Sequence, residues 1–272
     1  MNPTTPVAVS APIPFVAVVA LLGLAIGSFL NVVIYRVPRG ESLVAPGSHC
    51  PSCDTPIKGR HNVPVVSWLA LRGRCAGCRC RISVRYPLVE AGTAALFVGV
   101  TLRFGLSPQL PAYLYLSALA VVLAMIDVDV RRLPDSIVVP SYVVSGLLLI
   151  PAGAANGGWW TGERAAVGML SLLAIFFCLA IALPTEITFS DVKLAGLLGM
   201  YLGWMSWEAL FIGVVAALAV VAFSGKTLAL AASRRDRVYT AVPVAPCLLG
   251  ATVFTLFLAA PVTGWYPNFL AA

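Results

Sequence analysis

The sequence predicts an all-α polytopic membrane protein with about eight transmembrane helices and a small cytoplasmic zinc-ribbon-like domain. Of the 272 residues, 60% are hydrophobic and only 11% are charged, and the mean hydropathy is +0.92. A soluble domain carries about 25% charged residues. A further observation is a series of apolar runs close to the roughly 20 residues that cross a bilayer. These runs are 14–35, 88–105, 109–126, 137–152, 165–183, 194–206, 208–224 and 242–260.

The basic residues predict the orientation in the membrane. With the N-terminus outside, only Arg103 and Arg164 of the 18 Lys and Arg residues lie in outer segments. Such an excess on the inner side is the rule for membrane proteins. The net charge of +7 therefore orients the chain, and no nucleic-acid partner is expected. Met1–Pro14 contains no Lys or Arg, so it lacks the basic region of a secretory signal, and we expect the first span to be retained.

The chain is expected to have three parts. Residues 1–36 hold the N-terminal segment and the first span, residues 37–87 form a cytoplasmic cysteine-rich domain, and residues 88–272 hold the remaining spans. The middle part contains five of the seven cysteines and both histidines. A segment with so few large apolar side chains needs a cross-link, such as a bound metal or a disulfide, to fold.

Two CxxC motifs indicate the kind of cross-link. Cys50 and Cys53 form the first motif, and Cys75 and Cys78 form the second. Two such pairs are typical of a structural zinc site, because zinc takes four thiolates in a tetrahedron. Cytoplasmic thiols stay reduced, which disfavours disulfides. The alternative is unligated surface cysteines, and the sequence leaves open whether the fifth cysteine, Cys80, is a spare or an alternative ligand.

Asp127 and Asp191 stand at the ends of apolar runs. Asp127 closes a span that runs inward and Asp191 opens one that runs outward, so both are expected at the same depth on the inner side. An ionisable group at a bilayer edge is costly and marks a candidate functional site. If their helices pack together, the two carboxyls share a proton, because neighbouring like charges do not both ionise cheaply.

A carboxyl pair of this kind predicts aspartic peptidase chemistry. The ionised carboxylate takes a proton from water, while the protonated partner donates to the scissile carbonyl. Because the pair titrates as a unit, the roles of the two residues stay open. Structural alternatives exist: Asp135 or Ser136 is expected to cap a helix, and Ser190 or Asp191 would cap another, with Lys193 as an inner-face anchor.

Several motifs occur in the order of a known family. A first-span signature runs from Gly27 to Arg36, and the paired CxxC segment is followed by residues 85–90. Asp127 opens the pattern D-x-D-x-x-x-L-P-D, Asp191 lies in S-D-V-K-L, and residues 243–246 form a proline-containing start of the last span. Together these motifs resemble the type IV prepilin peptidases (prepilin leader peptidase/N-methyltransferases), a family of GxGD-type intramembrane aspartic proteases. The resemblance covers most of the chain.

The resemblance implies a function. Such enzymes lie in the bacterial cytoplasmic (inner) membrane and remove the basic leader peptide from type IV prepilins or pseudopilins at the cytoplasmic face. Asp127 and Asp191 match the two catalytic aspartates. Many members also methylate the new N-terminus with S-adenosylmethionine, and Glu90 is a candidate for methyl transfer by resemblance alone. The alternative for Glu90 is an interfacial acid paired with an arginine such as Arg85. The expected partners are prepilin or pseudopilin substrates and the lipid bilayer.

One departure from the family pattern concerns the second aspartate. Thr188 and Ser190 replace the usual glycines, which let the backbone approach closely. Side chains there are expected to reshape the site, narrow substrate choice or impair activity, and we expect Thr188, Phe189, Ser190 and Lys193 to contact the substrate. Two other functions stay open: a non-catalytic zinc-ribbon membrane scaffold, and an ion-coupled transporter that uses the acids as a proton relay.

Overall fold

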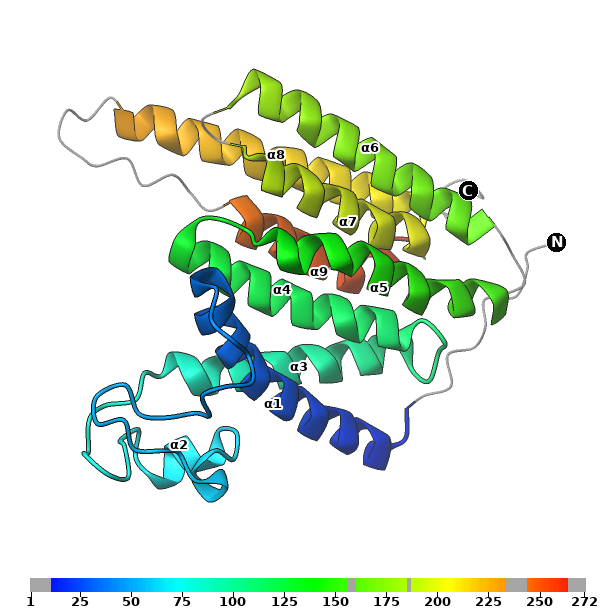
Figure 1. The fold of residues 1–272 in the computed structure, drawn as a ribbon. Helices are drawn as coiled ribbons and strands as arrows, with labels where there is room; N and C mark the ends of the chain where they lie inside the picture. Colours follow the sequence, from blue (N-terminus) through cyan, green and yellow to red (C-terminus); the bar gives the residue numbers. More distant parts are fainter. Residues whose placement is uncertain (1–10, 156–159, 185–186, 233–243, 264–272) are drawn as a thin grey trace. The chain divides into compact units, whose positions relative to one another are not determined.

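The computed structural model of the chain describes residues 11–155, 160–184, 187–232 and 244–263. Over these residues the protein is helical and has no β-strand (Figure 1). Short 3₁₀ turns occur at Val37–Arg39 and Gly59–His61. The α-helices are α1 (Ile13–Arg36), α2 (Val66–Ala70), α3 (Arg85–Phe104), α4 (Leu110–Val130), α5 (Asp135–Ala155), α6 (Trp160–Ala182), α7 (Phe189–Met205), α8 (Trp207–Ala232) and α9 (Val244–Thr263).

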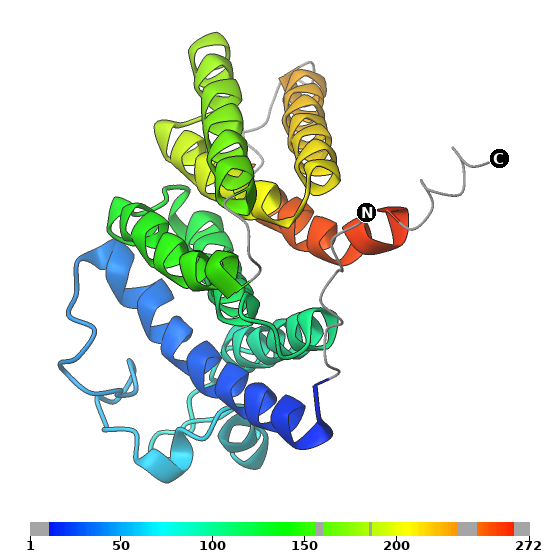
Figure 2. The same ribbon diagram turned by 90° about the vertical axis from the view of Figure 1, so that its right-hand side faces the viewer.

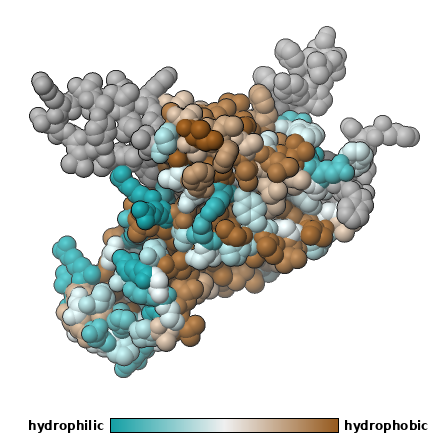
Figure 3. Space-filling model, turned by 45° about the horizontal axis from the view of Figure 1, so that its top comes forward, coloured by the Kyte–Doolittle hydropathy of each residue, from teal (hydrophilic) through white to brown (hydrophobic). Residues whose placement is uncertain are grey.

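The long helices correspond to the eight expected spans, which confirms the all-α multi-pass class. Among the described residues, five helices are long and apolar enough to cross a membrane, namely α1, α3, α4, α5 and α6. Helices α8 and α9 contain shorter apolar stretches, Trp207–Ala219 and Val244–Leu258, which are not among these five. Large apolar side chains are exposed along α5 and α6, and much of the surface seen in Figure 3 is hydrophobic, as a lipid-facing surface must be.

The helix ends differ from those expected, because polar residues at a helix end lower the hydropathy without ending the helix. Helix α4 continues past Asp127 to Val130, so Asp127 lies in its last turn. Helix α7 begins at Phe189, so Asp191 lies in its first turn rather than in a loop. Helix α8 extends to Ala232, well into the expected loop 225–241, and the rest of that loop lies outside the described residues.

The chain divides into two compact units, Met1–Val122 and Leu123–Ala272. In the first unit, α1 packs against α3, and glycine makes the close approach possible. A Cβ atom at Gly27 would lie 2.7 Å from the Cα atom of Glu90, and one at Gly23 would lie 2.6 Å from the Cα atom of Ala94. The division into 1–36, 37–87 and 88–272 stays a prediction.

The cysteine-rich segment is tied to α1 and α3 by buried polar contacts. The buried Arg36 side chain at the end of α1 donates to the carbonyl oxygens of Ser42 (2.8 Å) and Pro46 (2.6 Å). On α3, the Oε2 atom of Glu90 accepts a hydrogen bond of 2.7 Å from the backbone N–H of Val65. Arg36 at the end of α1 and Glu90 near the start of α3 therefore hold the segment against these two helices.

In the second unit, α6 and α7 lie side by side (Figure 2). Gly168 and Gly199 face each other so closely that a Cβ atom on either would meet the carbonyl oxygen of the other. Arg164, in the first turns of α6, donates to the carbonyl oxygens of Trp204 (2.6 Å) and Met205 (3.2 Å). These are carbonyls that the end of α7 would otherwise leave without a helical partner. Small residues and this cap fix α7 along α6.

Candidate active site and cysteine cluster

Within the described residues, four side chains of Arg, Lys, Asp or Glu are buried: Arg36, Glu90, Asp127 and Asp191. The first two hold the cysteine-rich segment in the first unit. The other two belong to the second unit, where Asp127 is 7% and Asp191 6% exposed. Acidic side chains are almost never this buried without a partner. Among the described residues of this unit, the pair selected from the sequence is thus also the pair of buried acids.

The Asp127 carboxyl group is influenced by two segments distant in sequence, α7 and α9, and by the neighbouring Arg131. The backbone N–H of Ala245 donates a hydrogen bond to it. Ala245 lies in the first turn of α9, where the N–H groups have no partner within the helix. The charges of Asp191 and Arg131 also act on the Asp127 carboxyl. The two acids are therefore close enough to interact electrostatically.

Asp191 takes part in a capping box at the start of α7. The N-cap residue is Thr188, whose backbone N–H and hydroxyl donate to the Oδ2 atom of Asp191 at 2.8 and 2.7 Å. In return, the Asp191 N–H donates to the Thr188 hydroxyl at 3.4 Å. Asp191 therefore takes part in capping as the third residue of the box, but the N-cap is Thr188 and not Ser190 or Asp191 as expected. Both donors use Oδ2, which leaves Oδ1 without a hydrogen bond from the described part of the chain.

The residues beside Asp191 have separate environments. Phe189 is 65% exposed, and its ring lies 6.2 Å from that of Phe177 on α6. The Lys193 ammonium group bonds both carboxylate oxygens of Asp135 at 2.8 Å. Because α5 begins at Asp135, this ion pair joins the starts of α5 and α7. The hydroxyl of Tyr142 on α5 also donates to the Lys193 carbonyl, so Lys193 is anchored twice.

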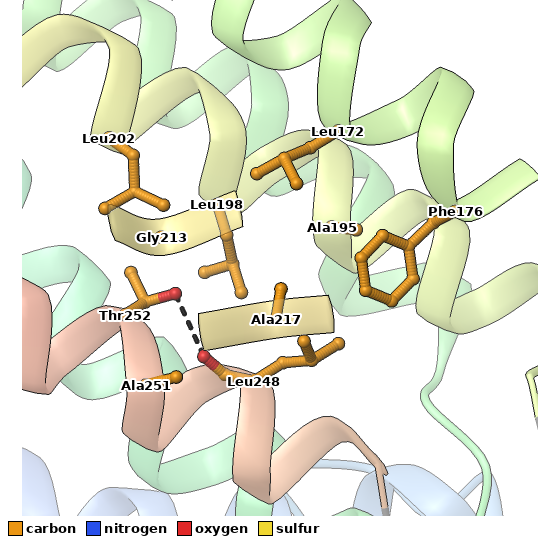
Figure 4. Close-up of a pocket in the computed structure, with 10 residues that line it drawn as sticks. All are labelled: Leu172, Phe176, Ala195, Leu198, Leu202, Gly213, Ala217, Leu248, Ala251 and Thr252. Carbon is orange, nitrogen blue, oxygen red and sulfur yellow. Dashed lines mark hydrogen bonds between the residues drawn. The ribbon is translucent and has the colours of Figure 1, made fainter. Parts of the chain in front are cut away.

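A small cavity lies among α6, α7, α8 and α9 (Figure 4). Its volume is about 10 Å³, which is roughly one water molecule. Apolar side chains such as Leu172, Phe176 and Leu198 line it, and the hydroxyl of Thr252 donates to the Leu248 carbonyl of its own helix at 2.9 Å. The cavity is too small and too apolar to receive a peptide, so it is part of the core packing.

The two CxxC motifs converge, as the sequence predicts. The Sγ atoms of Cys50, Cys53, Cys75 and Cys78 all lie within 4.8 Å of one another. Tetrahedral zinc with Zn–S bonds of about 2.3 Å requires sulfurs about 3.8 Å apart, so the cluster fits the metal. The Thr55 hydroxyl, 3.3 Å from the Cys53 sulfur, lowers the pKa of that thiol to about 6 and so favours the thiolate that zinc binds.

Two features of the acidic site were missed from the sequence. The hydrogen bond from the Thr188 hydroxyl to Asp191 was not foreseen. The spacing Thr188-x-x-Asp191 is the signature of a capping box and was a usable signal. The N–H of Ala245 had no such signal, because every residue but proline has one and only the fold brings this one to Asp127.

Comparison with known proteins gives the family. A model described as "Bacterial Peptidase A24 N-terminal domain" matches residues 21–104, and one described as "Type IV leader peptidase family" matches residues 114–225. The "Prepilin leader peptidase/N-methyltransferase" of Stutzerimonas stutzeri is 34% identical over 96% of both chains. This chain belongs to the type IV leader peptidase family. No solved structure matches it.

Other relatives carry the same description. The "Prepilin leader peptidase/N-methyltransferase" of Pseudomonas putida is 35% identical over 87% of this chain and 88% of its own. The one of Myxococcus xanthus is 43% identical over 70% of this chain and 57% of its own. The family resemblance drawn from the motifs is thereby confirmed. The first family match covers the CxxC segment, and the second covers Asp127 and Asp191.

Proposed function

We propose that this protein is a membrane aspartic endopeptidase that removes the basic leader peptide from type IV prepilins or pseudopilins. The observation that carries the proposal is the buried, interacting pair Asp127 and Asp191, contributed by α4 and α7 of a chain in the type IV leader peptidase family. Family membership and the apolar helices give a multi-pass protein of the bacterial inner membrane. We further propose that the site faces the cytoplasm, because the orientation with most Lys and Arg inside puts both acids there.

In the proposed mechanism the pair shares one proton. Water lies between the carboxyls, and the ionised one takes a proton as the water attacks the scissile carbonyl. The protonated one donates to the carbonyl oxygen and stabilises the tetrahedral intermediate. Proton return to the amine then releases the leader and restores the pair. The low-dielectric surroundings of two acids less than a tenth exposed strengthen each of these interactions.

The hydrogen bonds around the pair support this arrangement. Thr188 holds Asp191 through Oδ2 and leaves Oδ1 for water, and the Ala245 N–H fixes Asp127 from the start of α9. Each acid is therefore oriented by a helix N-terminus, whose unpaired N–H groups favour negative charge. A site held by helix ends is more rigid than one held by loops alone.

The substrate is proposed to enter from the lipid. A prepilin presents a basic leader on the inner side and an apolar helix within the bilayer, so its scissile bond must reach the depth of the two acids. Phe189, with its exposed ring beside Asp191, is placed to contact an apolar helix. Thr188 and Ser190 stay predicted substrate contacts. Lys193 also stays one, although its ammonium group is already bound by Asp135.

A second proposed activity is N-methylation of the new N-terminus with S-adenosylmethionine, since relatives over most of this chain are described as N-methyltransferases. Glu90 stays the candidate residue. Its carboxylate is buried and accepts the Val65 N–H, so in the structure it holds the cysteine-rich segment on α3. Glu90→Gln keeps the shape of the acceptor and removes its charge, and so would separate these roles: methylation lost with the segment still folded would support a direct one.

Co-expression with a prepilin-like substrate tests the proposed peptidase. Wild type should yield the shortened pilin, with the cut located by mass spectrometry, and Asp127→Asn should yield only the full-length form. Asp129→Asn is the matched control, because Asp129 is exposed near the end of the same helix, and it should cleave normally. Intact substrate with wild type would favour the scaffold, and proton-coupled flux without cleavage would favour the transporter.

A further inference from the structure

The two CxxC turns repeat one backbone pattern. In the first, the Cys50 N–H donates to the Thr55 carbonyl (3.1 Å), and the Asp54 N–H donates to the Cys50 carbonyl (2.9 Å). If Cys50 is counted as the first residue of the turn, Thr55 is the sixth, and Asp54 before it has a positive φ of 51°. An antiparallel bridge between His49 and Pro56 closes the turn.

The second turn follows the same pattern position by position. The Cys75 N–H donates to the Cys80 carbonyl (2.9 Å), and the Arg79 N–H donates to the Cys75 carbonyl (3.1 Å). Arg79 has a φ of 63°, and a bridge between Arg74 and Arg81 closes the turn. Cys80 therefore occupies the position that Thr55 holds in the first turn.

The side chains at this shared position make different contacts. The Thr55 hydroxyl stays within its own turn, 3.3 Å from the Cys53 sulfur. The Cys80 sulfur instead reaches across to the first turn and lies 3.5 Å from the Cys50 sulfur, closer than the Cys78 sulfur at 3.8 Å. Both distances match the separation of about 3.8 Å between two ligands of one tetrahedral zinc ion. A fifth thiol thus lies against Cys50, at the edge of the four-cysteine cluster.

We infer that Cys80 is a reserve zinc ligand that can take the place of Cys78. The two cysteines are two residues apart on one turn, and both thiols approach the Cys50 sulfur. With zinc bound, the Cys80 thiolate would replace the Cys78 thiolate, and the proton of Cys80 would pass to Cys78. Cys50, Cys53 and Cys75 would supply the other three sulfur ligands. The inference rests on the zinc site and not on peptidase activity.

The test uses purified full-length protein, with metal content and the cobalt(II) spectrum as readouts. Wild type and Cys80→Ser should each hold about one metal ion with the spectrum of four sulfur ligands. Cys78→Ser should do the same, because Cys80 completes the set, whereas the double variant Cys78→Ser/Cys80→Ser should lose the metal to a competing chelator at least tenfold more readily.

The outcomes distinguish the possibilities. The inference is overturned if Cys78→Ser loses metal as readily as the double variant, or if its cobalt spectrum is that of three sulfurs and one oxygen. A wild-type protein without metal, prepared with zinc present, would overturn the zinc site as well. None of these measurements uses leader cleavage. If Cys80 proves not to be a reserve ligand, the proposed peptidase activity is therefore still open to its own test.

Discussion

The cysteine-rich segment and helix α7 are stabilised in opposite ways. Between residues 37 and 87 the buried residues are Cys50, Ser67 and Gly73, and most large side chains are exposed. In α7, 12 of 17 residues are buried. The first region has too little apolar burial to fold without a cross-link, whereas the second is held by close packing on its neighbours.

This difference bears on where chemistry can be placed. A carboxyl pair must keep its geometry to within about half an ångström, which requires side chains supported by packing. Asp191 lies in the first turn of the well-buried helix α7, and its cap bonds fix its orientation. The cysteine-rich segment can depend on a metal without risk to that geometry. The two regions should therefore respond differently to loss of metal, to altered helix packing and to loss of a cap.

Removing the metal should unfold the cysteine-rich segment and leave the helices intact. A strong chelator, or the double variant Cys50→Ser/Cys53→Ser that leaves only three thiols, removes the cross-link on which local folding depends. Hydrogen exchange followed by mass spectrometry should show loss of protection in residues 37–87 alone. Equal loss of protection in α6 and α7 would contradict the comparison, and so would a segment that stays protected without metal.

Adding a methyl group between α6 and α7 should destabilise the helical unit. The Cβ atom of Gly199→Ala would meet the backbone carbonyl of Gly168, which has no side-chain freedom to yield, so we expect a loss of about 2–3 kcal/mol. Gly250→Ala on α9 is the matched control, because no atom lies within 4 Å of the added carbon. Its stability should change by less than about 1 kcal/mol, in the stabilising direction. Thermal unfolding in detergent measures both, and a Gly199→Ala protein as stable as the control would show that the helices are not held there.

Removing the Thr188 hydroxyl should have a smaller effect on stability and a measurable one on cleavage. Thr188→Val loses the bond to Oδ2 and about 1 kcal/mol of helix capping, and cleavage should slow by roughly tenfold as Asp191 loses orientation. Thr188→Ser, which keeps the hydroxyl, should restore the rate. Thr252→Val, whose hydroxyl bonds its own helix, controls for the substitution itself. If Thr188→Val cleaves at the wild-type rate, the Thr188 hydroxyl does not orient Asp191 for catalysis.

Most of the helical fold could be predicted from the sequence, because bilayer thickness and hydropathy act over twenty residues at a time. The helix boundaries could not be predicted as well. Asp127 and Asp191 lie inside α4 and α7, although polar residues there had suggested loops. The facing pair Gly168 and Gly199 was also not foreseen, since a contact between two glycines depends on helix rotation, which periodicity does not define here.

The candidate site was predicted in its acids and not in their neighbours. Asp127 and Asp191 stood out because buried charge is expensive wherever it occurs. The contacts around them depend on the fold over long separations: the Ala245 N–H reaches Asp127, and the neighbouring Lys193 pairs with Asp135. The hydrogen bond from Thr188 to Asp191 was not foreseen, because the family pattern drew attention to the glycine that Thr188 replaces.

The central claim is that Asp127 and Asp191 act as one catalytic unit, and single-turnover cleavage by purified variants tests it most directly. Asp127→Asn and Asp191→Asn should each slow cleavage by at least about 10²–10⁴-fold, and the double variant should be no slower than either, because one acid alone cannot complete the proton transfers. All three should keep wild-type helicity. Either single variant cleaving within about tenfold of wild type, or a double variant much slower than both, would contradict the claim.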